Sequence, residues 1–210
     1  MKAETVGGYA KVKWRAMRQL LRHPIVAVAT HWAFQSLLYM DPTERLFKLT
    51  LDAMLTLAGS TLLSVRLPRQ IAWPAAFIVA HTLNFLFNGH LWGVLKHYGL
   101  VSYTPEVFRI YVKALGRRAQ LEPAIQYVVI CGSLSRQQWS ASSDLDARII
   151  RNPGFINGLR ACWFLLRERS RALVARFPLD VYVLDDEARL QQLNAEEPLI
   201  ELVQRGGTHP

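Results

Sequence analysis

The chain has 210 residues, of which 51% are hydrophobic and 20% are charged, and its formal net charge is +9. This composition excludes a disordered or low-complexity chain and leaves room for one ordinary domain or two small ones. Its two cysteines cannot form a disulfide framework, and no Cys/His cluster has metal-ligand spacing, so we expect a reducing compartment.

The basic excess lies in the first part of the chain. Residues 1–110 hold 12 Lys+Arg against 5 Asp+Glu, whereas residues 111–210 hold 13 against 11. Three stretches nearly free of charge also lie in the first part: 24–40, 49–65 (in which only Asp52 is charged) and 70–95. We therefore predict two units, a basic, all-helical, membrane-embedded region at 1–110 and a charge-balanced domain at 111–210.

The longest uncharged stretch has the length of a membrane-spanning helix. Such a helix needs about 20 mostly apolar residues, which 70–95 provides and the two other stretches only approach. Trp73 lies near one end of this stretch, and Trp92 and Tyr98 lie near the other, where interfacial aromatic residues are common. The basic residues of 11–22 predict an interfacial helix on anionic lipid before the first stretch.

Positive residues in every connection conflict with three full crossings, because such residues favour the cytoplasmic side. Two arrangements remain: a hairpin that crosses twice through 46–66 and 71–95, or segments that enter one leaflet and return. Both place the C-terminal half in the cytoplasm at the cell membrane. The alternative is a soluble domain in which these helices are buried.

Polar residues recur at helical spacing inside the apolar stretches. One set is Lys48, Asp52, Thr56, Ser60 and Ser64, and a second set is His81, Asn84 and Asn88. Each set lies along one helix face. Two interpretations are open: packing between membrane helices, or a polar slot for a lipid head group or a lipid-linked substrate.

The second part of the chain alternates between strand and helix patterns. Apolar, β-branched runs predict strands at 126–131, 147–150 and 179–184, and a helical period predicts a helix over 155–177. Polar residues stand at the strand ends in this order: Gly132 and Ser133 after the first, Asp144 and Asp146 entering the second, and Asp180 near the start of the third.

This order of motifs over residues 120–190 resembles the DNA polymerase beta-type nucleotidyltransferase superfamily, and most of all its minimal prokaryotic members. The resemblance implies an α+β fold, with a short mixed sheet and flanking helices after the all-α hydrophobic region. It also implies that Gly132 and Ser133 hold the nucleotide phosphates, that Asp144 and Asp146 bind metals, and that Asp180 binds a metal or acts as a base.

The loop after Ser133 departs from the family pattern. Many members have a small residue, Arg and Gly where this chain has Ser135, Arg136 and Gln137. Arg136 is therefore expected either to contact phosphate or to lie on the surface. Trp139 is expected to be a loop hydrophobe rather than a platform for base stacking.

The physical chemistry of the carboxylates agrees with this assignment. Alternation along a strand puts Asp144 and Asp146 on one face, about 7 Å apart, while Leu145 points to the core. Mg²⁺ prefers carboxylates together with substrate phosphates, and two such ions clamp the oxygens of an in-line displacement. Gly132 lets the backbone approach a triphosphate, and Ser133 is expected to open a helix that favours anions.

We therefore expect an enzyme that moves a nucleoside monophosphate from an NTP to a hydroxyl or phosphate acceptor, with two Mg²⁺ ions. The membrane region would bring it to a lipid, a lipid-linked acceptor or a membrane enzyme of glycan assembly, and a partner chain or a homo-oligomer would supply further groups. The alternative is a non-catalytic subunit docked on a membrane partner such as a glycosyltransferase. Nucleic-acid polymerisation is disfavoured, because the basic charge does not lie near the Asp cluster.

Overall fold

The computed structural model describes residues 23–89, 91–99, 101, 103–141, 143–194 and 198–204. The helices are α2 (Pro24–Phe34), α3 (Pro42–Leu63), α4 (Arg69–Phe87), α5 (Leu91–Leu95), the 3-10 turn η1 (Lys96–Tyr98), α6 (Pro105–Leu121), α7 (Gly132–Ser135), α8 (Phe155–Val174) and α9 (Glu187–Asn194). The strands are β1 (Ile125–Cys131), β2 (Leu145–Arg151), β3 (Leu179–Leu184) and β4 (Ile200–Gln204). The basic helix expected at 11–22 lies outside the described residues.

The four strands form one mixed sheet in the order β3-β2-β1-β4. β1 pairs antiparallel with both β2 and β4, whereas β2 and β3 are parallel. Parallel neighbours need a crossover connection, and α8 provides it. The α+β class and the short mixed sheet expected from the sequence are therefore confirmed.

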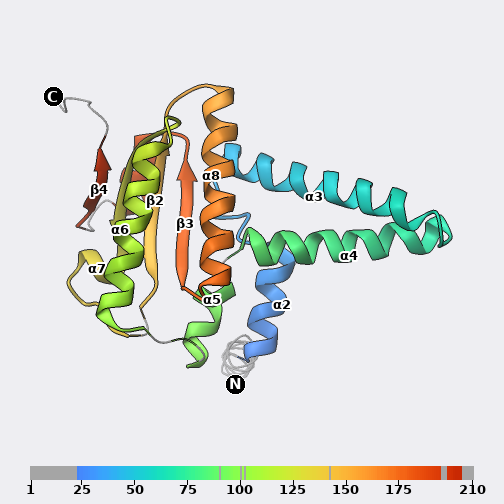
Figure 1. The fold of residues 1–210 in the computed structure, drawn as a ribbon, viewed down its shortest axis with the longest axis horizontal. Coiled ribbons are helices and arrows are strands. Elements are labelled where there is room, and N and C mark those ends of the chain that lie inside the picture. Colours follow the sequence, from blue (N-terminus) through green and yellow to red (C-terminus); the bar gives the residue numbers. More distant parts are fainter. Residues whose placement is uncertain are drawn as a thin grey trace, which may run out of the picture.

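The main core lies between the sheet and the helices α6 and α8 (Figure 1). Buried residues alternate along the strands, so that Leu145, Ala147 and Ile149 of β2 face these helices. A smaller cluster on the opposite face includes Ile150 and Leu190, the latter from α9. The intervening residues of β2, among them Asp146, are therefore left on the face that α6 and α8 do not cover.

Helices α3 and α4 form a long hairpin that projects from the side of α8, away from the sheet (Figure 1). At 1.5 Å per residue they are about 33 Å and 28 Å long, and both are long and apolar enough to cross a membrane. Only 17% of the most apolar stretch of α3 and 33% of that of α4 are buried. A core helix of a soluble domain would be mostly covered, whereas the chain itself leaves most of this hairpin exposed.

The return segment expected at 71–95 is too long. Helix α4 ends at Phe87, and Trp92 lies in the separate short helix α5. The Trp92 indole donates a hydrogen bond to the carbonyl of Leu173 at 2.8 Å, which fixes α5 to α8. Trp92 is thus a structural anchor rather than the interfacial end of the apolar helix.

The two polar stripes of the hairpin face each other. His81 Nδ1 lies 2.7 Å from Asp52 Oδ2, and the Asn84 side chain donates to the carbonyl of Lys48 at 3.1 Å. The other ring nitrogen of His81 lies 2.9 Å from the carbonyl of Trp32. His81 and Asp52 therefore bond side chain to side chain across the hairpin, and Asn84 bonds to the backbone of the opposite helix, which favours the packing interpretation. Asp52 Oδ1 is buried and makes no hydrogen bond within the described part of the chain.

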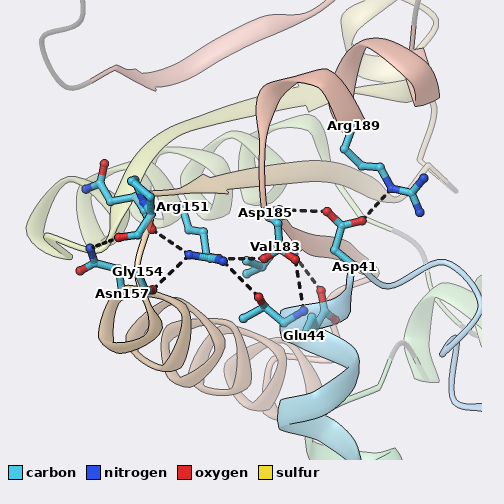
Figure 2. A network of polar contacts seen from close by, with 11 residues as sticks. Asp41, Glu44, Arg151, Gly154, Asn157, Val183, Asp185 and Arg189 are labelled. Carbon is cyan, nitrogen blue, oxygen red and sulfur yellow. Dashed lines mark hydrogen bonds and ion pairs between the residues drawn. The ribbon is translucent and has the colours of Figure 1, made fainter.

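The root of the hairpin is bonded to the end of β3 by a polar network (Figure 2). Asp41 accepts from the backbone N–H of Asp185 at 2.9 Å and from Arg189 at 2.8 Å. Asp185 in turn accepts from the backbone N–H of Thr43 and from Arg151. The start of α3 is therefore an integral edge of the sheet domain.

The expected division at residue 110 falls in the middle of α6. The whole of α6 lies with the sheet, and it contacts β1 and β4. Thr104 caps this helix, because its side chain accepts from the backbone N–H of Val107. Helix α6 therefore packs with the sheet along its length, and the hairpin that precedes it in the chain is bonded to the edge of the sheet.

Candidate active site

One row of residues crosses three strands at the edge of the sheet where β2 and β3 begin. Cys131, the last residue of β1, pairs in register with Asp146 of β2, and Asp146 pairs in register with Asp180 of β3. Gly132 follows Cys131 directly and begins α7. The strand register therefore brings together the glycine and two of the carboxylates that the sequence singled out.

Gly132 is required by the carboxylate beside it. Its φ is +77°, in the region that favours glycine. A Cβ atom at this position would lie 2.0 Å from Asp146 Oδ2, which is well inside van der Waals contact. The Asp146 carboxylate thus occupies the space that a side chain at position 132 would need, so only glycine fits there without displacing it.

Asp144 is held by a cation that the sequence did not single out. Lys96 Nζ lies 2.5 Å from Asp144 Oδ1, and the Lys96 side chain is only 9% exposed. Lys96 belongs to η1, in the segment that connects the hairpin to α6. No local motif marks Lys96, since the 48 positions that separate it from Asp144 are bridged only by the fold.

Arg148 forms an ion pair with Asp180. Its guanidinium nitrogen lies 4.0 Å from Asp180 Oδ2, and it also donates to the backbone carbonyls of Ala147 and Asp180. The guanidinium lies over the ring of Tyr182, 5.0 Å from the ring centroid. Arg148 is therefore the arginine beside Asp180, whereas Arg151 bonds to Asp185.

Burial and the neighbouring carboxylates raise the pKa of Asp146. The pKa of Asp146 is raised to about 7, first by burial and then by the charges of Asp144 and Asp180, while Arg148 opposes the shift. Crowded carboxylates cannot all ionise without cost unless a cation neutralises them. Such a perturbed group in a cluster of like charges is typical of functional sites.

Ser133 lies next to this row with an unused hydroxyl. Its Oγ atom is buried and makes no hydrogen bond within the described part of the chain. Buried polar atoms are normally satisfied, so an orphaned hydroxyl fits a position that receives a ligand. The helix that begins here is only four residues long, so the anion-favouring helix dipole expected at Ser133 is a minor contribution.

In the loop after Ser133, Gln137 takes a backbone conformation that is usually adopted by glycine. Gln137 has φ +58°, the left-handed conformation that a side chain disfavours. The resemblance noted in the sequence leads us to expect a glycine at this position, and Gln137 takes a backbone conformation suited to glycine. Arg136 is exposed, which agrees with the surface alternative. Trp139 packs against Phe108 with ring centroids 5.4 Å apart, so its prediction as a loop hydrophobe is confirmed.

The carboxylates do not yet surround a metal position. Among the described residues, no three His, Cys, Asp or Glu side chains are arranged to hold a metal ion. Lys96 Nζ instead pairs with the Asp144 oxygen at 2.5 Å. The chemistry of the row still suits Mg²⁺, since Asp144, Asp146 and Asp180 offer only oxygen ligands.

Comparison with known proteins gives no identification. No family model, no curated protein and no solved structure matches this chain.

Proposed function

We propose that the protein is a Mg²⁺-dependent nucleotidyltransferase at the cytoplasmic face of the cell membrane. The observation that carries this proposal is the row Cys131–Asp146–Asp180, with Gly132 and Ser133 directly after its first member. A buried carboxylate with a pKa of about 7, two neighbouring carboxylates and an orphaned hydroxyl gather at one edge of the sheet. Together they offer ligands for a cation and for the phosphates that it accompanies.

The three carboxylates and Ser133 each have a role in this proposal. Asp144, Asp146 and Asp180 would hold Mg²⁺, and the metal supplies neutralisation of the phosphates and of the charge that develops during displacement. The Ser133 hydroxyl donates a hydrogen bond to a phosphate oxygen of the NTP. Asp180, beside Arg148, is placed to accept the proton of the attacking hydroxyl.

The reaction is a single displacement at phosphorus. The acceptor oxygen forms a bond to the α-phosphorus of the NTP, the bond from that phosphorus to the bridging oxygen breaks, and pyrophosphate leaves. When the acceptor is a hydroxyl, its proton passes to Asp180; when it is a phosphate oxygen, no proton transfer is needed. The positions of these groups lower the barrier by orientation and by fixed charge.

The hairpin motivates the membrane part of the proposal. Both of its helices approach the thickness of the hydrocarbon core, about 30 Å, and their apolar residues are largely exposed. The acceptor class is therefore a membrane lipid or a lipid-linked molecule, as in glycan or lipid-linked sugar assembly. A homo-oligomer or a membrane protein partner would contribute groups for base and acceptor selection.

One observation favours a second function, that of a non-catalytic subunit docked on a membrane partner such as a glycosyltransferase. Lys96 Nζ already neutralises Asp144, as an ion would. In a protein without turnover, this pair would be a permanent structural contact. The two functions differ in whether Mg²⁺ and a nucleotide displace Lys96 from Asp144.

Pyrophosphate release by the full-length protein in detergent micelles tests the proposed activity, with each of the four NTPs, Mg²⁺ and membrane lipid extract as acceptor. Asp144→Asn and Asp146→Asn should each lower the rate by more than about 100-fold, because an amide is a poor ligand for a hard cation. Asp186→Asn is the matched control, since Asp186 is exposed at the opposite end of β3. Equal rates in Asp146→Asn and Asp186→Asn would refute the assignment.

A further inference from the structure

A groove of about 910 Å³ lies between α3 and α8 at the root of the hairpin. Its volume falls in the range of small-molecule sites, about 300–1,000 Å³. Its walls are mostly apolar and include Leu46, Phe47, Leu51, Met54, Leu159 and Trp163. The Phe47 and Trp163 rings face each other edge-on, with centroids 6.4 Å apart, and Trp163 remains 51% exposed.

The groove has a positive mouth on the side of α8. Arg160 and Arg167 converge on one carboxylate, that of Glu122, at 3.0 Å and 3.6 Å. Their side chains are 50% and 48% exposed, whereas Glu122 is nearly covered at 11%. Two cations share one anion, so the mouth carries a net positive charge and presents guanidinium groups that suit a phosphate.

The length of the groove matches one leaflet of a bilayer. It follows α3 from Thr43 to Met54, which is about 16 Å of helix. The hydrocarbon core is about 30 Å thick, so this distance is about half of it. The hairpin projects from α8 (Figure 1), and its root therefore lies at head-group level when the hairpin is inserted. Trp and Arg side chains favour that level.

We infer that this groove binds one anionic phospholipid, with an acyl chain between α3 and α8 and its phosphate at Arg160 and Arg167. The charge of the mouth selects the anionic head group, and the apolar walls receive the chain. The inference rests on the membrane placement of the hairpin proposed above, and it is independent of the transfer chemistry.

The groove is separate from the carboxylates of the candidate active site. Arg151 and Gly154, which border the groove, lie at or after the end of β2, whereas Asp146 lies at its start. Arg151 lies five positions after Asp146 along the strand, which is about 17 Å. The bound lipid is therefore a fixed component that sets the depth and tilt of the protein, and it is not the acceptor of the proposed reaction.

Tryptophan quenching by brominated lipids tests the inference. The full-length protein is reconstituted into phosphatidylcholine vesicles that contain brominated phosphatidylglycerol or, at the same low mole fraction, brominated phosphatidylcholine. The signal of Trp163 is the difference between the wild-type chain and Trp163→Phe. Brominated phosphatidylglycerol should quench this signal about fivefold more, the enrichment expected of one net charge at a lipid surface.

Three variants assign the effect to the groove. The double variant Arg160→Gln with Arg167→Gln should make the two lipids quench equally. The control Arg109→Gln should change nothing, because Arg109 is exposed near the start of α6, whereas Glu122 follows the end of that helix. Thr50→Phe, which narrows the groove, should reduce quenching by both lipids.

Other outcomes overturn the inference in distinguishable ways. Equal quenching by both lipids in the wild-type chain means that Trp163 faces bulk bilayer and that no lipid is selected. Absence of quenching means that protein, such as a second copy of the chain, covers the groove. Release of the protein from the vesicles by alkaline carbonate refutes the membrane placement itself and the inference with it.

Discussion

The buried ion pair between Glu44 and Arg169 should hold the hairpin to the sheet domain. Arg169 NH2 donates to Glu44 Oε1 at 2.7 Å, and Glu44 Oε2 accepts from the backbone N–H of Val183 at 2.8 Å. The two side chains are 0% and 2% exposed. Replacing Glu44 with Gln removes the negative charge and turns one of these two acceptor contacts into an unfavourable contact between donors.

The expected loss in the free energy of unfolding follows from the contacts that Arg169 keeps when Glu44 is replaced. Its remaining partners are neutral acceptors, Asn88 Oδ1 at 2.9 Å and the carbonyl of Val181 at 2.6 Å, so the cation would be buried without a counter-charge. Removing one partner of a buried pair costs about 3–5 kcal/mol. That is a large share of the 5–15 kcal/mol that stabilises an average domain.

Urea unfolding of the full-length protein in detergent micelles, followed by tryptophan fluorescence, measures this cost. Arg189→Gln is the control, because Arg189 bonds to Asp41 at the same hairpin root but is 43% exposed. The double variant Glu44→Gln with Arg169→Met should recover part of the loss, since no uncompensated charge remains. If Glu44→Gln is no more destabilising than Arg189→Gln, the root of α3 is not docked on β3 as described.

Three further predictions concern the site. Lys96→Met should tighten Mg²⁺ binding in calorimetry by about tenfold, because the ammonium no longer competes for Asp144, whereas Lys96→Arg should not; equal affinities would contradict this competition. Gln137→Gly should stabilise the protein by about 1 kcal/mol in urea unfolding by relieving a positive φ, and the control Gln138→Gly, where φ is not positive, should destabilise it. The raised pKa of Asp146 means that the folded protein holds a proton that the unfolded chain releases, so metal-free stability should fall by up to about 4 kcal/mol as the pH rises from about 4 to about 7. Asp146→Asn should flatten this part of the pH profile, and an unchanged slope would show that Asp146 is not its source.

Strands β1 and β3 were predictable from the sequence because their apolar, β-branched runs are almost wholly buried. The β-branched run before Gly132 and the run after Pro178 gave β1 to within one residue and β3 without error. β4 was missed, since its five residues lie at the edge of the sheet and alternate weakly. The position of Asp180 beside Asp146 followed from motif order, but the register that aligns them needed the fold.

The contacts between the two parts of the chain could not be predicted. Lys96 reaches Asp144 and Glu44 reaches Arg169 across long sequence separations, and neither pair has a local spacing that signals it. The polar stripes of the hairpin were visible as a helical period, but their pairing through His81 and Asp52 depends on how α3 and α4 rotate against each other. Helical period alone defines a face, not its partner.

In the proposed function, Asp144, Asp146 and Asp180 bind a nucleotide through a divalent cation. Isothermal titration of the full-length protein in micelles with a non-hydrolysable NTP analogue, with and without Mg²⁺, tests it most directly. We expect binding only when Mg²⁺ is present, loss of that binding in Asp146→Asn, and normal binding in Asp186→Asn. Absence of binding by the wild-type chain, or binding that is equal with and without Mg²⁺, would contradict it.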